Sequence, residues 1–280
     1  MDGGRSAEGD SLFVGTIPDV YESLLVPMIF QMAADGLAAI VAAHSPSDIL
    51  ETAAGTGVLT RVLVDLCPDA RITATDLSPA MLAVAASRMP EDPRVTRRPA
   101  DALDLPFASG TFDVVACQFG AMFFPDRVAG FREARRVLRP HGSFIFNVWD
   151  QIEHNEVPYV IESALNAADP VRPLTFMSRL PHGYFSTAQI RDDLERAGLT
   201  ATTITEVDGS CRTTAADAAV AYCQGTPLRL DLERHETWTV ADATALVERA
   251  LLSHFGDGQF DAPIRSYEIV ARPARREGAD

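Results

Sequence analysis

The sequence predicts an α/β fold: a doubly wound, seven-stranded sheet that is mostly parallel, has an antiparallel last strand and carries helical lid additions. Three observations predict this fold. Short apolar segments alternate with helical patterns throughout residues 48–148, as in a parallel sheet covered by helices on both faces. A turn of small residues over 52–57 joins the first strand to the first helix of this series. The last apolar segment, residues 265–272, alternates as an antiparallel edge strand does.

Composition and charge limit the classes of partner. The chain has 280 residues, 47% of them hydrophobic, so it can bury a large core without disulfides or a structural metal. Its formal charge of −15 argues against a nucleic-acid backbone as a partner. The cysteines form neither a CxxC pair nor a zinc-finger pattern, so no metal site is expected. No signal-peptide pattern and no apolar run of membrane-span length is visible, and we expect a cytoplasmic protein without a membrane partner.

The whole chain is expected to form one domain. A polar tail over residues 1–11 precedes an amphipathic helix from about residue 28 to 43, which Pro46 and Ser47 end. We assign residues 1–46 to an N-terminal helical lid, 47–150 to a cofactor-binding core, and 151–186 and 209–263 to insertions that cover the substrate.

Strands and helices alternate through the core. The first strand covers residues 48–51, and its helix runs to about Cys67. The second strand, residues 71–75, ends in Asp76, and Ser78-Pro79 then supply an N-cap and a first helical residue. Further strands are expected over residues 95–97, 113–117 and 143–148, with a helix over 127–138 that Pro140 and Gly142 stop.

The second half of the chain is less regular. A Pro-rich loop covers residues 169–185, and strands are expected over 200–207 and 265–272. Helices are expected over residues 155–168, 187–197, 215–223 and 240–255.

Polar side chains stand at the ends of four successive strands of the core: Glu51, Asp76, Asp101 and Gln118. Ligands of open parallel sheets bind outside these carboxyl ends. An acid at the end of the second strand is placed to accept hydrogen bonds from two ribose hydroxyls. An acid one strand further along can accept from the amine of adenine. The pattern therefore favours a ligand that contains adenosine.

The turn after the first strand indicates what the adenosine carries. Gly55 and Gly57 allow close approach of a ligand to the backbone, but Thr60 stands where a dinucleotide-binding turn has its third glycine. Glu51 at the same turn would repel a pyrophosphate and attract a cationic amine. An adenosine joined to a cationic amino acid fits better than a dinucleotide, and S-adenosylmethionine is such a molecule.

These segments resemble the motifs of class I S-adenosylmethionine-dependent methyltransferases of the small-molecule type. Residues 51–57 (ETAAGTG) resemble the first motif and residues 75–82 (TDLSPAML) the second. Residues 100–102, 105–107, 111–115 and 136–142 are similar to the blocks that follow. The resemblance covers about 48–148. It implies a Rossmann-like sheet and methyl transfer to a small organic molecule through an O, N, C or S acceptor.

The resemblance also implies a role for each matching residue. Glu51 would face the amino end of the cofactor, Asp76 would hold the ribose, and Leu77 and Met81 would enclose adenine. Ala53 stands where the family has a glycine, which adds a methyl group beside the methionine moiety. The residues expected to bind the cofactor are Tyr21, Glu51, Ala53, Gly55, Gly57, Asp76, Leu77, Met81, Asp101, Ala102 and Gln118.

Catalytic residues are not assigned. His154 and His182 are the histidines expected near the mouth of the site, and a surface position is the favoured interpretation of each. Six apolar residues suggest a pocket for a small organic substrate: Phe119, Met122, Phe123, Phe124, Phe176 and Tyr184.

Two other functions stay open. The first is an NAD(P)-dependent oxidoreductase on a related Rossmann sheet. It predicts a set such as Tyr-x-x-x-Lys, yet the chain contains no lysine. The second is a non-catalytic protein that binds S-adenosylmethionine.

Overall fold

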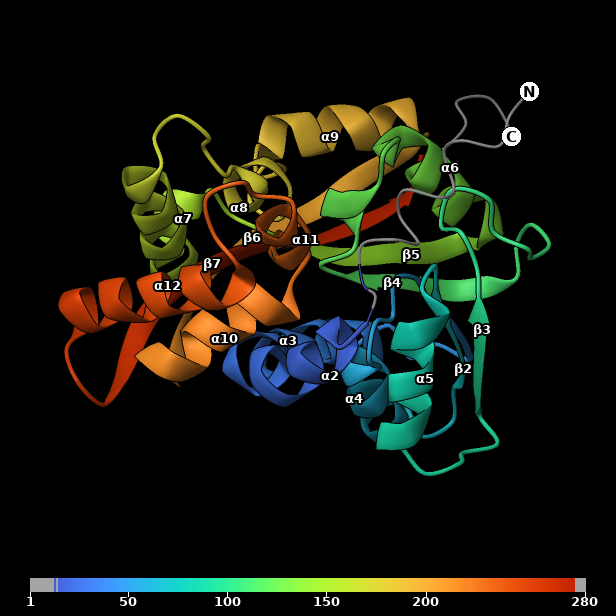
Figure 1. Cartoon of the computed structure of the whole chain (residues 1–280). Helices are drawn as coiled ribbons and strands as arrows, with labels where there is room; N and C mark the ends of the chain where they lie inside the picture. The colour runs from blue at the N-terminus through green and yellow to red at the C-terminus, as the bar shows by residue number, and fades with distance from the viewer. Residues whose placement is uncertain (1–12, 14, 275–280) are drawn as a thin grey trace, which may run out of the picture.

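Seven strands form one sheet in the computed structural model, which describes residue 13 and residues 15–274 (Figure 1). The strand order is β3-β2-β1-β4-β5-β7-β6. Strands β1 to β5 are parallel, and β7 is antiparallel to both β5 and β6. The mostly parallel sheet with an antiparallel last strand is therefore confirmed. The strands are β1 (Asp48–Glu51), β2 (Arg71–Asp76), β3 (Val95–Pro99), β4 (Phe112–Gln118), β5 (Leu138–Trp149), β6 (Leu199–Thr214) and β7 (Gln259–Pro273).

Helices cover both faces of this sheet. Figure 1 shows α3, α4 and α5 on one face and α6 and α9 on the other. The α-helices are α2 (Ile17–Val20), α3 (Gln31–Ala42), α4 (Val58–Leu66), α5 (Pro79–Arg88), α6 (Arg127–Val137), α7 (Glu156–Ala168), α8 (Phe176–Arg179), α9 (Thr187–Arg196), α10 (Ala215–Gly225), α11 (Leu228–Glu233) and α12 (Val240–Phe255). The short helices α8 and α11 were not predicted from the sequence.

Local chemistry sets where α5 begins. The Ser78 hydroxyl accepts a hydrogen bond from the Met81 amide, and Pro79 is the first helical residue. The predicted N-cap is confirmed. The cap fixes the direction in which the chain leaves β2, so the backbone after Asp76 is held at the carboxyl edge of the sheet.

The N-terminal helix begins earlier than residue 28. Helical structure is continuous from α2 through a π-helical segment, Tyr21–Phe30, into α3. Pro27 lies inside the π-helical segment, where it cannot donate a backbone hydrogen bond.

By length and composition alone, the continuous stretch Ile17–Ala42 could cross a membrane, which was not expected. That feature is equally typical of a core helix, and Leu37, Ala38 and Val41 are fully buried against the sheet and α4.

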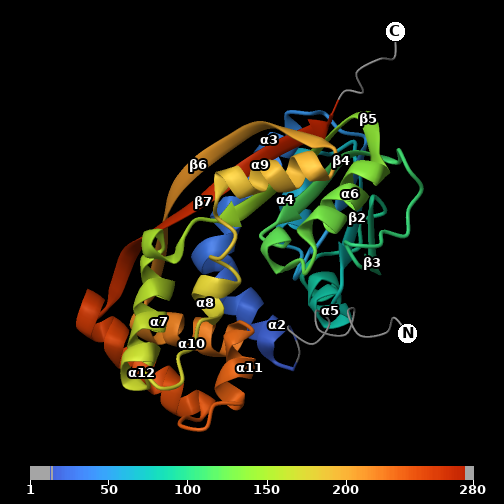
Figure 2. The same ribbon diagram turned by 90° about the horizontal axis from the view of Figure 1, so that it is seen from above.

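The hairpin of β6 and β7 is much longer than predicted. Pairing continues from Leu199 opposite Pro273 to Thr214 opposite Gln259, whereas β5 ends opposite Ser266. The hairpin therefore projects beyond the carboxyl edge of the parallel strands, where α7, α10 and α12 pack beside it (Figure 2). The segment 209–263 consequently begins and ends in strand.

Candidate cofactor site

Glu51 ends β1 and is almost fully buried, with 1% of its surface exposed. The Thr60 hydroxyl, in the first turn of α4, donates a 2.5 Å hydrogen bond to Glu51 Oε2. The pKa of Glu51 is raised to about 8, chiefly by burial; the Thr60 hydrogen bond opposes the rise and the nearby Asp76 carboxylate adds to it. At neutral pH the Glu51 carboxyl is therefore protonated in most of the molecules.

The turn after β1 is built from residues in the left-handed region. Gly55 and Gly57 have φ angles of 55° and 80°, which glycine adopts without strain. Ala53 has a φ of 52° and so adopts the same region with a side chain. The backbone at residue 53 thus has a conformation typical of the glycine in the family motif, although the residue is alanine.

Asp76 joins the turn to the start of α5. Its Oδ2 accepts from the Gly55 amide at 2.8 Å, and its Oδ1 accepts from the Ser78 amide at 2.8 Å. Both carboxylate oxygens therefore lie at the carboxyl edge of the sheet, beside the glycine turn. Met81 is buried, and its Cε would lie 3.8 Å from a Cβ built on Gly55. Gly55, Asp76 and Met81 are thus brought together.

The ends of β2 and β3 are also held together. The Ala100 amide donates to the Asp76 carbonyl at 3.0 Å, which places Asp101 directly after this link. Asp101 Oδ1 accepts from the Leu103 amide at 2.8 Å. Leu77, Asp101 and Ala102 are partly exposed, as residues that line a ligand site would be.

Gln118 and Tyr21 connect the core to the N-terminal helical segment. Gln118 Nε2 donates to the Phe30 carbonyl at 2.9 Å. The Tyr21 ring stacks on Phe30 at 4.8 Å between centroids, and Phe13 meets Tyr21 edge-on at 6.1 Å. Burial raises the pKa of Tyr21, and the charge of Asp76 adds to this rise. Tyr21 therefore lies close enough to Asp76, at the end of β2, for that carboxylate to affect its pKa.

An ion pair that the sequence reasoning missed ties this helical segment to the glycine turn. Arg61 Nη2 lies 2.9 Å from Glu22 Oε1, and Arg61 Nη1 donates to the Thr56 carbonyl at 2.8 Å. The signal in the sequence was a charged residue within each of two apolar helices. The two partners are 39 positions apart in the chain, which hid their contact.

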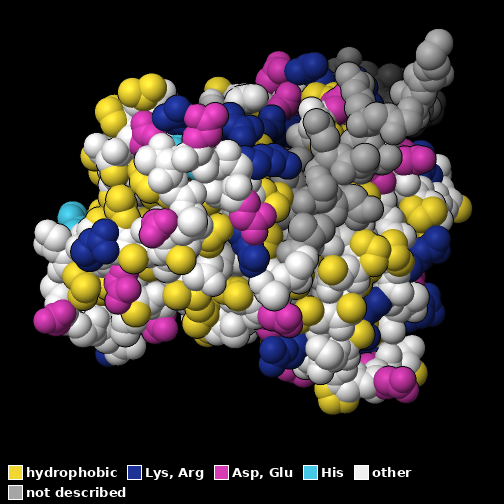
Figure 3. Space-filling model, in the orientation of Figure 1, with side chains coloured by type: hydrophobic (Ala, Val, Ile, Leu, Met, Phe, Trp, Pro, Cys, Tyr) yellow, Lys and Arg dark blue, Asp and Glu magenta, His cyan; other side chains and the backbone are white. Residues whose placement is uncertain are grey.

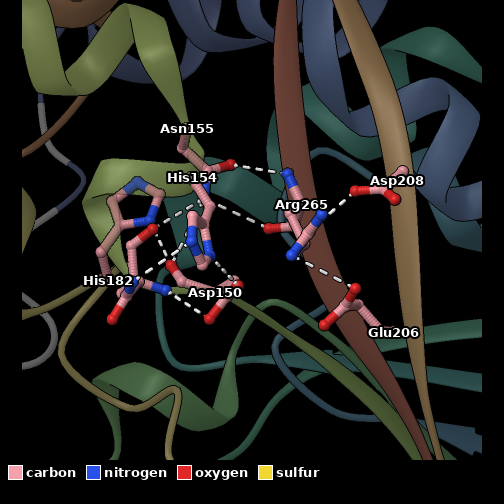
Figure 4. A network of polar contacts seen from close by, with 8 residues as sticks. Asp150, His154, Asn155, His182, Glu206, Asp208 and Arg265 are labelled. Carbon is pink, nitrogen blue, oxygen red and sulfur yellow. Dashed lines mark hydrogen bonds and ion pairs between the residues drawn. The ribbon is translucent and has the colours of Figure 1, made fainter.

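The two histidines near the end of β5 are engaged with Asp150, which is 2% exposed (Figure 4). His154 Nδ1 lies 2.5 Å from Asp150 Oδ2, and His182 Nδ1 lies 2.8 Å from the Asp150 carbonyl. His154 is exposed, as expected, but the surface position expected for His182 was wrong because that ring is buried. Burial lowers the pKa of His182 to about 4. Asn155 and Arg265 complete the network.

The expected substrate pocket is largely core. Phe119 stacks on Trp149 with centroids 3.9 Å apart, and Met122, Phe176 and Tyr184 are buried. Phe123 and Phe124 keep part of their surface exposed, and Phe123 meets Phe13 edge-on. The described residues contain no group of His, Cys, Asp and Glu that could hold a metal ion.

Comparison with known proteins gives a family match for the core. Residues 50–146 match the model of a methyltransferase domain. A demethylmenaquinone methyltransferase of Deinococcus radiodurans is 37% identical over 109 residues, which are 39% of this chain and 45% of that protein. A malonyl-acyl-carrier-protein O-methyltransferase of Geobacter sulfurreducens is 31% identical over 58% of this chain and 59% of that protein. The chain spans about half the length of the curated relatives it matches.

Solved structures share the fold. The YcgJ protein of Bacillus subtilis superposes with a TM-score of 0.56 at 17% identity, over 88% of this chain and 100% of that one. The cyclase SpnF superposes with a TM-score of 0.56 at 21% identity, over 88% and 84%. At these identities the likeness concerns the fold alone.

Proposed function

Residues 50–146 belong to the class I S-adenosylmethionine-dependent methyltransferase family, and from this premise we propose that the chain transfers a methyl group from S-adenosylmethionine to a small organic molecule. The observation that carries the proposal is the buried Glu51 beside Asp76 at the glycine turn. The Asp76 carboxylate opposes the pyrophosphate of a dinucleotide, and Glu51, whose raised pKa keeps it largely protonated at neutral pH, becomes a carboxylate when a cationic group lies beside it. The residues present therefore fit S-adenosylmethionine.

Each predicted residue receives a role in this proposal. Asp76 holds the ribose hydroxyls, and Glu51 faces the amino group of the cofactor. Gly55, Gly57 and Ala53 offer their backbone to the methionine part, which Gln118 flanks. Leu77, Met81, Asp101 and Ala102 surround adenine, and Tyr21 covers the site.

When bound, the cofactor supplies a methyl group that its sulfonium already activates. The chain's own task is then to align the acceptor and to exclude water. The Phe13 ring meets both Tyr21 and Phe123 edge-on, and this aromatic group suits the second task. Neither His154 nor His182 is assigned as a base, because Asp150 engages both.

We also propose how the chain is divided into lid and core, and in which compartment the protein works. Within the predicted N-terminal lid, 1–46, residue 13 and residues 15–46 act as a lid on the core, 47–150, whereas residues 1–12 and 14 lie outside the described residues. The segments 151–186 and 209–263 enclose the acceptor. The names of the relatives, which mention demethylmenaquinone and a malonyl-acyl-carrier protein, support an organic acceptor without choosing the atom. All four cysteines are free and buried, which suits a reducing cytoplasm.

The test is turnover with S-adenosylmethionine labelled in its methyl group, against a panel of phenols, quinols, amines, thiols and carboxylic acids. We expect label in one acceptor class together with stoichiometric S-adenosylhomocysteine. Tight cofactor binding without transfer to any class would favour a non-catalytic binder. Binding of a nicotinamide dinucleotide in its place would favour the oxidoreductase.

A further inference from the structure

A cavity of about 230 Å³ lies between α3 and the outer strands of the sheet. Helix α3 contributes Ala33 and Gly36, β5 contributes Trp149, and β7 contributes Ser266 and Glu268. None of these residues belongs to the predicted cofactor site. The cavity is therefore a separate feature of the fold.

Glu268 brings a carboxyl group into this mainly apolar space. Burial raises its pKa, and no hydrogen-bond or ion-pair partner faces it among residues 13 and 15–274. A Cβ added to Gly36 would lie 2.8 Å from Glu268 Oε1, so the carboxyl packs against bare backbone. A partly buried carboxylate without a partner is costly, and a bound cation would offset that cost.

The rest of the wall suits the organic part of such a cation. Trp149 is 6% exposed, and while its ring stacks on Phe119, it also lines the cavity. The indole ring offers an apolar surface beside the carboxyl group, which suits the alkyl part of an organic ammonium ion. One carboxylate supplies too few oxygen ligands for a divalent metal ion. These features select an organic cation.

We propose that this cavity binds a small organic ammonium ion, with its nitrogen at Glu268 and Ser266 and its alkyl part against Trp149 and Ala33. Acidic side chains are spread over the face seen in Figure 3, and the formal charge of −15 attracts cations to the whole molecule. The proposal does not depend on methyl transfer.

The probe is n-butylammonium, compared with n-butanol and butyrate, which have the same alkyl chain. Binding is followed by the NMR signals of the two indole N–H groups, from Trp149 and Trp238, which Trp238→Phe assigns. We expect n-butylammonium to shift the Trp149 signal saturably at millimolar concentration. The Kd of n-butanol should be about tenfold larger than that of n-butylammonium. Butyrate should leave the signal unchanged.

Three variants test the residues named. Glu268→Gln should weaken n-butylammonium about tenfold and abolish its advantage over the alcohol. Ala33→Leu fills the cavity and should abolish the shift, whereas Ala39→Leu, at an exposed site on the same helix, should not change it. Equal affinity for ammonium and alcohol, or parent-like binding in Glu268→Gln or Ala33→Leu, would overturn the proposal. If Ala33→Leu does not fold, Glu268→Gln decides alone.

Discussion

The hydroxyl of Thr60 holds the buried carboxyl of Glu51 through a 2.5 Å hydrogen bond, and each residue is only 1% exposed. Thr60 stands at the position where a dinucleotide-binding turn has its third glycine. In a dinucleotide-binding turn that glycine allows close packing of the helix on the strand. In this protein, the Thr60 hydroxyl instead holds the Glu51 carboxyl at the turn.

The affinity for S-adenosylmethionine should rise as pH is raised from 6 to 8. Burial raises the pKa of free Glu51 to about 8, so the group is protonated below that value. A bound ammonium group favours the carboxylate and lowers this pKa, so binding at pH 7 should release most of one proton. Calorimetry in buffers of different ionisation enthalpy measures the release.

Substitutions at Glu51 and Thr60 supply the controls. Glu51→Gln should bind the cofactor without proton release and with a flat pH profile. Thr60→Val removes the hydrogen bond that lowers the pKa of Glu51, so the rise of cofactor affinity with pH should move to higher pH. Thr60→Ser keeps the hydroxyl and should show the same pH dependence of affinity as the parent. A parent-like profile in Glu51→Gln would assign the proton to another group.

Ala53 and Gly120 should be energetically coupled. A Cβ built on Gly120 would lie 2.4 Å from Ala53 Cβ and 2.9 Å from Cys117 Sγ. Gly120→Ala should therefore destabilise the protein by about 2–3 kcal/mol. Ala53→Gly should be neutral or stabilise by up to about 1 kcal/mol, because it removes left-handed strain at the expense of chain entropy.

A double-mutant cycle measured by urea unfolding tests this coupling. Ala53→Gly should recover about 1 kcal/mol of the loss in Gly120→Ala, and the contact with Cys117 should prevent full recovery. Gly110→Ala is the control for strain without a clash: its added Cβ meets nothing within 4 Å, its φ of 69° disfavours alanine, and its loss of stability should be additive with Ala53→Gly. Strict additivity of Ala53→Gly and Gly120→Ala would contradict the contact.

His182 should make the protein less stable in mild acid. Its folded-state pKa is lowered to about 4 by burial, against an ordinary value of 6.5. The neutral ring is favoured in the fold, so stability is complete above pH 6.5 and falls as pH drops towards 4. The loss between pH 7 and 5 should be about 2 kcal/mol. His182→Gln should remove this part of the pH dependence in urea unfolding; an unchanged slope would show that another group titrates.

Arg61→Ala should speed dissociation of the cofactor. The substitution releases both Glu22 and the Thr56 carbonyl, which join the N-terminal helical segment to the turn. We expect the dissociation rate to rise about fivefold while association changes little. Stopped-flow displacement measures both rates. Arg71→Ala, in an ion pair whose arginine is 75% exposed, is the control and should behave as the parent.

Short-range chemistry made part of the structure predictable. The Ser78 cap, the strand ends at Glu51 and Asp76 and the glycine turn all depend on neighbours within a few residues. Helix α12 was predicted at its observed bounds because Thr239 opens it with a capping box and Gly256 follows its end.

The rest depends on partners that are distant in the chain. The outer end of the β6–β7 hairpin carries exposed polar residues such as Asp208 and Asp261, so only its pairing reveals it as strand. The burial of His182 comes from its contact with Asp150, 32 residues away. The early start of the N-terminal helix was hidden by Pro18 and Pro27, which usually mark helix ends or breaks.

The central claim is that the strand-end acids bind S-adenosylmethionine, and calorimetric titration of the parent chain and Asp76→Asn tests it most directly. We predict that the parent binds S-adenosylmethionine and not NAD. The free energy of unfolding of Asp76→Asn should stay within about 2 kcal/mol of the parent value. The variant should bind the cofactor at least about tenfold more weakly, because a charge-assisted hydrogen bond to the ribose is lost. Undiminished affinity in Asp76→Asn, or binding of NAD in place of S-adenosylmethionine, would contradict the account.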